Sequence, residues 1–172
     1  MVIEAAVSDS VTNTGFPALT VLWLLPLIGA GVVLALPARS YQFAKYLALA
    51  VSVAVLVVAA VLGVAFDRGG EQFQFVESHS WIPAFGTSYT LGLDGIALVL
   101  VLLTAVLVPL LLIAGWNDVD EESRGSVKGY FALILVLETL MIGVFVATDV
   151  FLFYVFFEVM LIPVYFMIGR YG

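Results

Sequence analysis

The chain has 172 residues and is strongly apolar: 63% of them are hydrophobic and only 11% are charged. Soluble domains are about half apolar and about a quarter charged, so this chain has too little polar surface to fold in water. It contains no cysteine, which excludes disulfides, thiolate metal sites and cysteine-bound iron–sulfur clusters. With a net charge of −7, it has no basic patch for nucleic acid. The composition is that of an integral membrane protein.

The amino-terminal segment, residues 1–17, does not resemble a secretory signal. It contains Glu4 and Asp9 but no Lys or Arg, so the positively charged start of a signal peptide is missing. We therefore expect residues 1–17 to lie outside the membrane and the first apolar stretch to remain as a membrane span.

Five stretches are apolar over a length close to the roughly 20 residues that a transmembrane helix requires. They cover residues 18–36, 46–66, 91–114, 130–147 and 150–168. The sequence therefore predicts an all-α membrane fold of five helices, with the first two in region 18–66 and the last two in region 130–172. Only Thr148 and Asp149 separate the last two stretches, so these two helices should be antiparallel neighbours.

The longer connections differ in character. Residues 67–90 form an external loop in which residues 72–75 (QFQF) alternate polar and apolar side chains, a pattern typical of a half-buried strand. We expect a small hairpin on the membrane surface there. Residues 115–129 form a charged cytoplasmic loop, and its acidic run at residues 118–122 (DVDEE) is best explained as a solvated surface.

The positive side chains indicate how the chain crosses the membrane. If all five helices are real, five positive residues fall on one side: Arg39, Lys45, Arg124, Lys128 and Arg170. Only Arg68 falls on the other side. Because positive residues concentrate in cytoplasmic loops, the sequence predicts a multi-pass protein of the cell (inner) membrane. Its N-terminus would be outside, and the segment after the fifth helix would be cytoplasmic.

The residue that points most directly to function is Glu158, in the fifth apolar stretch. It lies eight residues from the start of that stretch, which at 1.5 Å per residue places it about 12 Å deep. An ionisable side chain at this depth costs about 2.5–3.5 kcal/mol to insert, and such residues mark ion pathways and proton relays. The plainer alternative is a protonated acid that forms a packing hydrogen bond between helices.

Pro163 supports the functional interpretation of Glu158. A proline at this position cannot donate a hydrogen bond to the carbonyl of Val159, one residue beyond the acid. Freed backbone groups are tolerated in membranes where they are buried or line a wet cavity. The acid and the freed carbonyl together could hold a proton or a cation, although a packing kink is the simpler explanation for the proline alone.

Glu138 lies at a similar depth, about 13 Å, in the fourth apolar stretch. Two orientations remain open. If Glu138 faces Glu158, the two acids can share and relay a proton. If it faces another way, Glu138 pairs with a different helix.

Two further acids, Asp149 and Asp94, are weaker candidates. Asp149 directly precedes the fifth helix and is expected to cap its free N–H groups. Asp94, near the start of the third helix, is a supporting candidate whose role stays open. His79 is the only histidine and lies in the external loop, so no histidine-based metal site is expected.

Three segments resemble a known family. Residues 89–96 (YTLGLDGI) open the third stretch, residues 141–149 (MIGVFVATD) close the fourth, and residues 151–166 (FLFYVFFEVMLIPVYF) run through the fifth. Together they resemble subunit M of respiratory complex I, the NADH–quinone oxidoreductase, which is called chain 4 in mitochondria. The resemblance covers the whole chain and is strongest over residues 89–172.

This resemblance implies a proton-translocating subunit of the membrane arm, one of three antiporter-like pumps. In the family, the glutamate at the position of Glu158 pairs with a lysine on a later helix, and quinone chemistry elsewhere drives proton movement. The chain would hold three peripheral helices and, in region 130–172, the start of the first inverted repeat. We therefore expect it to be the N-terminal portion of a longer subunit.

The resemblance also implies the chemistry of the surrounding complex. It places FMN and iron–sulfur clusters in partner subunits, with quinone as the substrate and no redox site, cofactor or metal in this chain. The expected neighbours are the antiporter-like L and N subunits and lipid, not nucleic acid. Two alternatives remain. One is a subunit of a multisubunit cation/proton antiporter or membrane-bound hydrogenase, and the other is a structural scaffold in which Glu138 and Glu158 only form packing hydrogen bonds.

Overall fold

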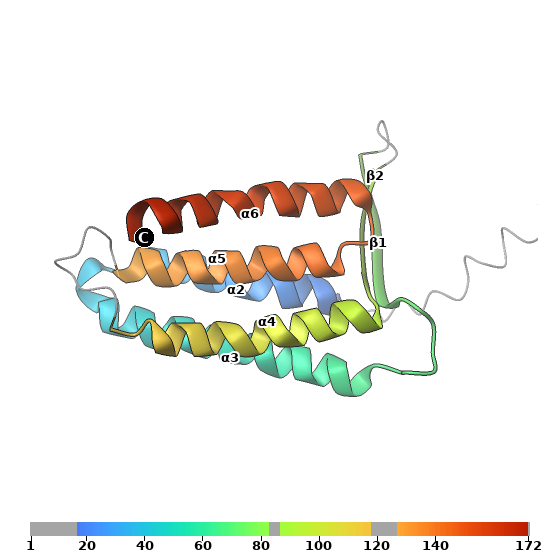
Figure 1. Ribbon diagram of the computed structural model, residues 1–172, viewed down its shortest axis with the longest axis horizontal. Helices are drawn as coiled ribbons and strands as arrows, with labels where there is room; N and C mark the ends of the chain where they lie inside the picture. Colours follow the sequence, from blue (N-terminus) through green and yellow to red (C-terminus); the bar gives the residue numbers. More distant parts are fainter. Residues whose placement is uncertain (1–16, 83–86, 118–126, 172) are drawn as a thin grey trace, which may run out of the picture.

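The computed structural model describes residues 17–82, 87–117 and 127–171. These residues form five long helices and a two-stranded sheet (Figure 1). The helices are α2 (Ala18–Ala35), α3 (Tyr41–Ala65), α4 (Gly95–Ala114), α5 (Val127–Val146) and α6 (Val150–Tyr171), and a short 3-10 helix, η1 (Ala38–Ser40), precedes α3. The strands are β1 (Gln74–Ile82) and β2 (Thr87–Leu93). The described part of the chain confirms the predicted helical fold with its small hairpin.

All five helices are long and apolar enough to cross a membrane. Lipid offers no hydrogen bonds to the backbone, so a spanning segment must satisfy its N–H and C=O groups within its own helix. Within the described residues, the five predicted spans are therefore confirmed. The acidic run at residues 118–122, together with Glu4, Asp9 and Arg124, lies outside the described residues.

Three helix starts differ from the prediction. α3 begins at Tyr41, five residues before the predicted start, and α5 begins at Val127, three residues before it. Both helices thereby include a lysine that the hydropathy pattern assigns to a loop. A lysine can lie along a helix end because its flexible stem carries the charged tip to a polar group. α4 begins four residues late, at Gly95, because β2 continues to Leu93.

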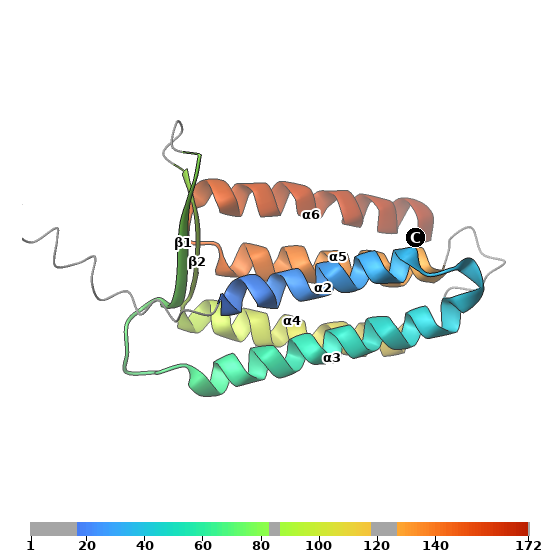
Figure 2. The same cartoon turned by 180° about the vertical axis from the view of Figure 1, so that it is seen from behind.

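The helices lie side by side, with α5 in the interior and α6 at one edge (Figures 1 and 2). α5 packs against α2, α3, α4 and α6, and 56% of its most apolar 18-residue stretch is buried. α6 packs mainly on α5, runs antiparallel to it as predicted, and has only 17% of the corresponding stretch buried. The described residues therefore leave a broad face of α6 uncovered.

The two ends of the bundle differ in chemistry. At the hairpin end, β1 and β2 lie across the ends of the helices (Figure 1). At the opposite end, the lysine end, Lys45 and Lys128 lie near the starts of α3 and α5. The segments that begin at the hairpin end are α2, α4 and α6, and those that begin at the lysine end are α3 and α5 (Figure 2).

The hairpin is held by backbone pairing and by buried leucines. β1 and β2 are antiparallel, with Glu77 opposite Leu91 and His79 opposite Tyr89. Leu91 and Leu93 are fully buried and pack on the apolar residues of the helices at this end. The predicted hairpin is confirmed, but it extends three residues into the stretch that the pattern assigns to the third span. Its leucines belong to the core rather than to a helix.

The N-terminus of α2 is capped by a residue of the hairpin. Pro17, at the cap position, makes no side-chain hydrogen bond to the helix. Instead the Glu77 carboxylate on β1 accepts from the N–H of Leu19 at 2.7 Å and from that of Thr20 at 3.2 Å. Because the first N–H groups of a helix have no partner within it, this contact both satisfies α2 and fixes the hairpin to it.

α4 and α6 are capped by the aspartates that precede them. Asp94 accepts from the N–H of Ala97 at 2.6 Å. Asp149 accepts from the N–H groups of Phe151 and Leu152 at 2.9 and 3.0 Å. The predicted cap at Asp149 is confirmed, and Asp94, whose role the sequence leaves open, has the same role. Negative charge at a helix N-terminus is also favoured by the helix dipole.

At the lysine end, two lysines bind backbone carbonyls where other helices end. Lys45 donates to the carbonyl of Trp116, just past α4. Lys128 donates to the carbonyls of Leu36 and Leu34 at the end of α2. The last carbonyls of a helix have no partner within it and carry partial negative charge, so both contacts are favourable.

We expect Glu77→Ala to destabilise the protein, because the N–H groups of Leu19 and Thr20 lose their acceptor. Leaving such buried groups unpaired costs about 1–3 kcal/mol. Thermal unfolding of the full-length subunit in its complex measures the effect. Glu71→Ala is the matched control, since Glu71 is an exposed acid of the same connection. Equal stability of the two variants would contradict the capping role of Glu77.

Candidate functional site

Two acids lie inside membrane-spanning helices at equal distance from the hairpin end. Glu138 is eight residues before the end of α5, and Glu158 is eight residues after the start of α6. At 1.5 Å per residue, each lies about 12 Å from that end of its helix. The two acids are therefore at similar depth, as the sequence predicts.

Glu138 is completely buried in the core. Its exposed fraction is 0%, and neither carboxylate oxygen has a hydrogen-bond partner among the described residues. Phe131 and Ile142 lie on the same side of α5, because seven and four residues are close to whole helical turns. The ring of Phe131 packs edge-on against Trp116, with centroids 5.9 Å apart, and the Lys45 ammonium lies 5.9 Å from its centroid. This side of α5 therefore faces the core shared with α3 and α4.

Another side of α5 meets α6. A Cβ atom added to Gly143 would lie 2.6 Å from the ring of Phe156, so the two helices touch at this glycine. Gly143 is five residues beyond Glu138, which corresponds to a rotation of about 140° around the helix axis. Glu138 thus points away from α6.

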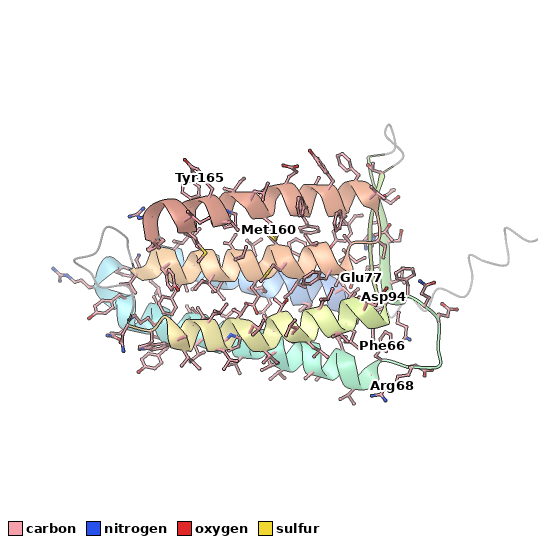
Figure 3. The ribbon with its side chains drawn as sticks, viewed as in Figure 1. Phe66, Arg68, Glu77, Asp94, Met160 and Tyr165 are labelled. Carbon is pink, nitrogen blue, oxygen red and sulfur yellow. The ribbon has the colours of Figure 1, made fainter. Side chains whose placement is uncertain are left out.

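Glu158 lies on the uncovered face of α6 and is exposed. Tyr154, one turn earlier, is also exposed. In Figure 3, Tyr165 points away from the bundle, whereas Met160 points toward α5. Glu138 therefore does not face Glu158, and neither of its oxygens bonds a different helix among the described residues.

Three hydroxyl side chains are also buried in the helices around Glu138. They are Ser52 on α3, Thr104 on α4 and Thr139 on α5. Each donates to a carbonyl of its own helix, at 2.9, 2.9 and 3.1 Å respectively. Because a hydroxyl has a single proton, these side chains retain only lone pairs for other contacts. Their hydroxyls are therefore acceptors toward any further partner.

Prolines interrupt three of the helices: Pro26 in α2, Pro109 in α4 and Pro163 in α6. All three are buried, and each leaves the carbonyl four residues earlier without its helical donor. In α6 this carbonyl belongs to Val159, directly after Glu158, as the sequence predicts. The prolines of α2 and α4 are not singled out by the sequence reasoning, although their place inside apolar stretches is the same signal.

His79 and the two capping aspartates all lie at the hairpin end of the bundle. His79 is exposed on β1 and stacks on Tyr89, with ring centroids 6.3 Å apart. The described residues contain no group of three His, Cys, Asp or Glu side chains that could hold a metal ion. Asp94 and Asp149 are engaged with helix N-termini and act by fixing α4 and α6 in place.

A polar network at the hairpin end escapes sequence reasoning. Glu77 accepts from the hydroxyl of Thr20, and that hydroxyl lies 2.8 Å from the Tyr89 hydroxyl. The indole N–H of Trp23 donates to the Tyr89 hydroxyl at 3.0 Å. The sequence marks Glu77 only as an external charge, because its partners on α2 lie more than fifty residues away, 57 for Thr20. Figure 3 places Glu77 and Asp94 together at this end of the bundle.

A cleft of about 600 Å³ opens between α4, α5 and α6 near the hairpin end. Its lining is mainly apolar and includes Leu100, Met141, Phe145, Phe157 and Met160, with Asp94 as the charged member. The Asp94 carboxylate already caps α4. The cleft therefore presents a surface for packing rather than a reactive group.

The sequence is similar to a family of respiratory proteins. Residues 71–144 match the family described as NADH-ubiquinone oxidoreductase chain 4, amino terminus. The chain is 48% identical over 182 residues to NADH-quinone oxidoreductase subunit M of Mycobacterium tuberculosis, and 43% identical over 159 residues to subunit M of Rhodobacter capsulatus. These matches cover 91% and 90% of the chain but 33% and 30% of the relatives. The chain thus spans about a third of the length of the curated relatives it matches.

The fold is also similar to that of a solved structure, the Mrp complex from Dietzia sp. DQ12-45-1b. The TM-score is 0.70 at 22% sequence identity, and the match covers 90% of this chain and 16% of that chain. At this identity the likeness shows a shared fold alone.

We expect Gly143→Ala to destabilise the contact between α5 and α6. The added Cβ would lie 2.6 Å from the Phe156 ring, and overpacking of this kind costs about 1–3 kcal/mol. Gly31→Ala on α2 is the control, because no described side chain lies within 4 Å of its Cβ position. Thermal stability of the purified complex measures both variants. A Gly143→Ala protein as stable as Gly31→Ala would contradict the close helix contact.

Proposed function

Because the chain belongs to the subunit M (chain 4) family of NADH–quinone oxidoreductases, we propose that it is the amino-terminal part of a proton-translocating membrane-arm subunit of that enzyme. The observation that carries the proposal is the 48% identity to a subunit M across 91% of the chain. Electrons pass from NADH to quinone through FMN and iron–sulfur clusters of partner subunits. This chain, which has no cysteine to hold such clusters, contributes proton movement.

Glu158 is the principal proton-transfer residue in this proposal. It is exposed on the face of α6 that the described residues leave uncovered, about 12 Å from the helix start. A charge facing lipid at this depth costs about 2.5–3.5 kcal/mol, so the carboxylate requires a partner from outside the described residues. A lysine on a later helix, as in the family, fits that requirement. The carbonyl freed by Pro163 adds an acceptor beside the acid.

Glu138 is the second proton-transfer residue. It lies at the same depth as Glu158 but inside the core, so its contribution to pumping is smaller than that of the acid on the open face. Asp94 and Asp149 support the site by fixing the starts of α4 and α6.

The lysine end faces the cytoplasm in this proposal. Lys45, Lys128 and Arg170 lie at that end, whereas Arg68 lies in the connection on the hairpin side. Positive residues concentrate on the cytoplasmic side of membrane proteins, so the hairpin lies outside. The uncovered face of α6 receives the rest of the subunit, and the antiporter-like L and N subunits and lipid surround the assembly.

A second candidate function is a subunit of a multisubunit cation/proton antiporter, which is favoured by the fold shared with the Mrp complex. That likeness is limited to the fold, whereas the family match names an NADH–quinone enzyme. Oxidation of NADH by the copurified complex distinguishes the two functions, because an antiporter does not consume NADH.

We expect Glu158→Gln to assemble normally but to lose NADH-driven proton pumping by about a hundredfold, the lower end of what a positioned proton-transfer group contributes. The measurement is the pH gradient formed by reconstituted complex, normalised to NADH oxidation. Glu138→Gln should lose less. Normal pumping by Glu158→Gln would sink the assignment, and a larger loss in Glu138→Gln would reverse the ranking of the two acids.

The orientation is tested by introduced cysteines, since the chain has none of its own. Ser78→Cys on β1 should react with a membrane-impermeant thiol reagent applied from outside the cell. Gln42→Cys, at the lysine end, should react only from the cytoplasmic side. Both positions are exposed in the structure. The opposite pattern of labelling would mean that the proposed orientation is inverted.

A further inference from the structure

Glu138 is the described acid that lacks a partner. Glu77, Asp94 and Asp149 bind backbone N–H groups, and the other acids of the described residues are exposed. Glu138 is 0% exposed, and neither of its oxygens is bonded within the part of the chain that the structure describes. Its packing therefore sets which protonation state it can hold.

The elements packed against α5 place no cation near Glu138. α2, α4 and β2 contain no charged residue within their bounds. α3 carries Lys45, which is bound to the Trp116 carbonyl at the lysine end, and α6 carries Glu158 and Arg170, both exposed. An isolated charge in such an interior loses its hydration without gaining a partner, so the group is neutralised instead.

Three buried hydroxyls of the helices at this depth have no proton left to donate to Glu138. The hydroxyls of Ser52, Thr104 and Thr139 already donate within their own helices. Pro26 and Pro109 free two carbonyls in α2 and α4, both helices that pack on α5. A carboxylate needs donors, whereas a protonated acid has an O–H that needs an acceptor. Neither oxygen of Glu138 accepts a hydrogen bond from the described residues, so the site fits the protonated acid better than the carboxylate.

We propose that Glu138 is a proton-binding site in its own right, enclosed by the core of α2, α3, α4 and α5, occupied by a proton at rest and separate from Glu158. The separation follows from geometry, because Glu138 points away from α6 while Glu158 lies on the uncovered face of α6. This inference deepens the proposed function and rests on it for the use of the bound proton. The occupancy of the site by a proton does not depend on that function.

Infrared spectroscopy of the purified complex at neutral pH tests the proposal. The spectrum of wild type minus Glu138→Gln should contain the carbonyl band of a protonated carboxylic acid and no carboxylate bands. The spectrum of Glu158→Gln minus that of the double variant, which lacks both acids, should contain the same acid band. Carboxylate bands in the first difference, or a band that disappears when Glu158 is replaced, would overturn the proposal.

Thr139→Val is the matched control, because it removes a buried polar group from the adjacent position without removing a carboxyl group. It should give no acid band. If Glu138→Gln does not assemble, Glu138→Met takes its place, since both replace a neutral acid by a neutral side chain of similar length. Failure of both to assemble contradicts a neutral Glu138. Failure of the proposed function would be seen separately. Glu158→Gln would then pump protons normally, while the infrared result for Glu138 stayed the same.

Discussion

The free N–H groups at the start of α2 are bonded by a glutamate 57 residues further along the chain, and this contact joins the hairpin to the helices. A membrane helix satisfies its own interior, so its unsatisfied groups are at its ends. At the hairpin end, carboxylates accept from the N-termini of α2, α4 and α6. At the lysine end, Lys45 and Lys128 donate to carbonyls where α4 and α2 end. Each end therefore has the charge that the helix dipoles require.

Most charged groups of the described helices therefore lie at the two ends of the bundle. Glu138 and Glu158 are the acids that lie between these ends. Glu158, on the uncovered face of α6, needs a partner from elsewhere, which suits a residue that exchanges a proton with another helix. Glu138, buried on α5 among the helices of the core, accepts no hydrogen bond from the described residues, which favours its neutral form. The two acids therefore have different environments although they lie at the same depth in adjacent helices.

Much of the fold and of the helix capping could be predicted from the sequence. Five helices follow from the length of the apolar stretches, the α5–α6 pairing from the short turn at Thr148, and the Asp149 cap from its place before a helix. The length of the hairpin could not be predicted, because Leu91 and Leu93 are as apolar as a membrane span and only their contacts place them in a strand. Glu77 was missed as a cap because its partners are distant in the sequence.

The sequence by itself determined how many spans there are and how deep each acid lies, because hydropathy and the fixed rise per residue are properties of the chain read in order. Only the tertiary structure decided which way each acid points. A soluble helix shows its buried side by the contrast between polar and apolar faces. In a membrane helix both sides are apolar, so the rotation of α5 and α6 about their axes is set by packing, such as the contact of Gly143 with Phe156.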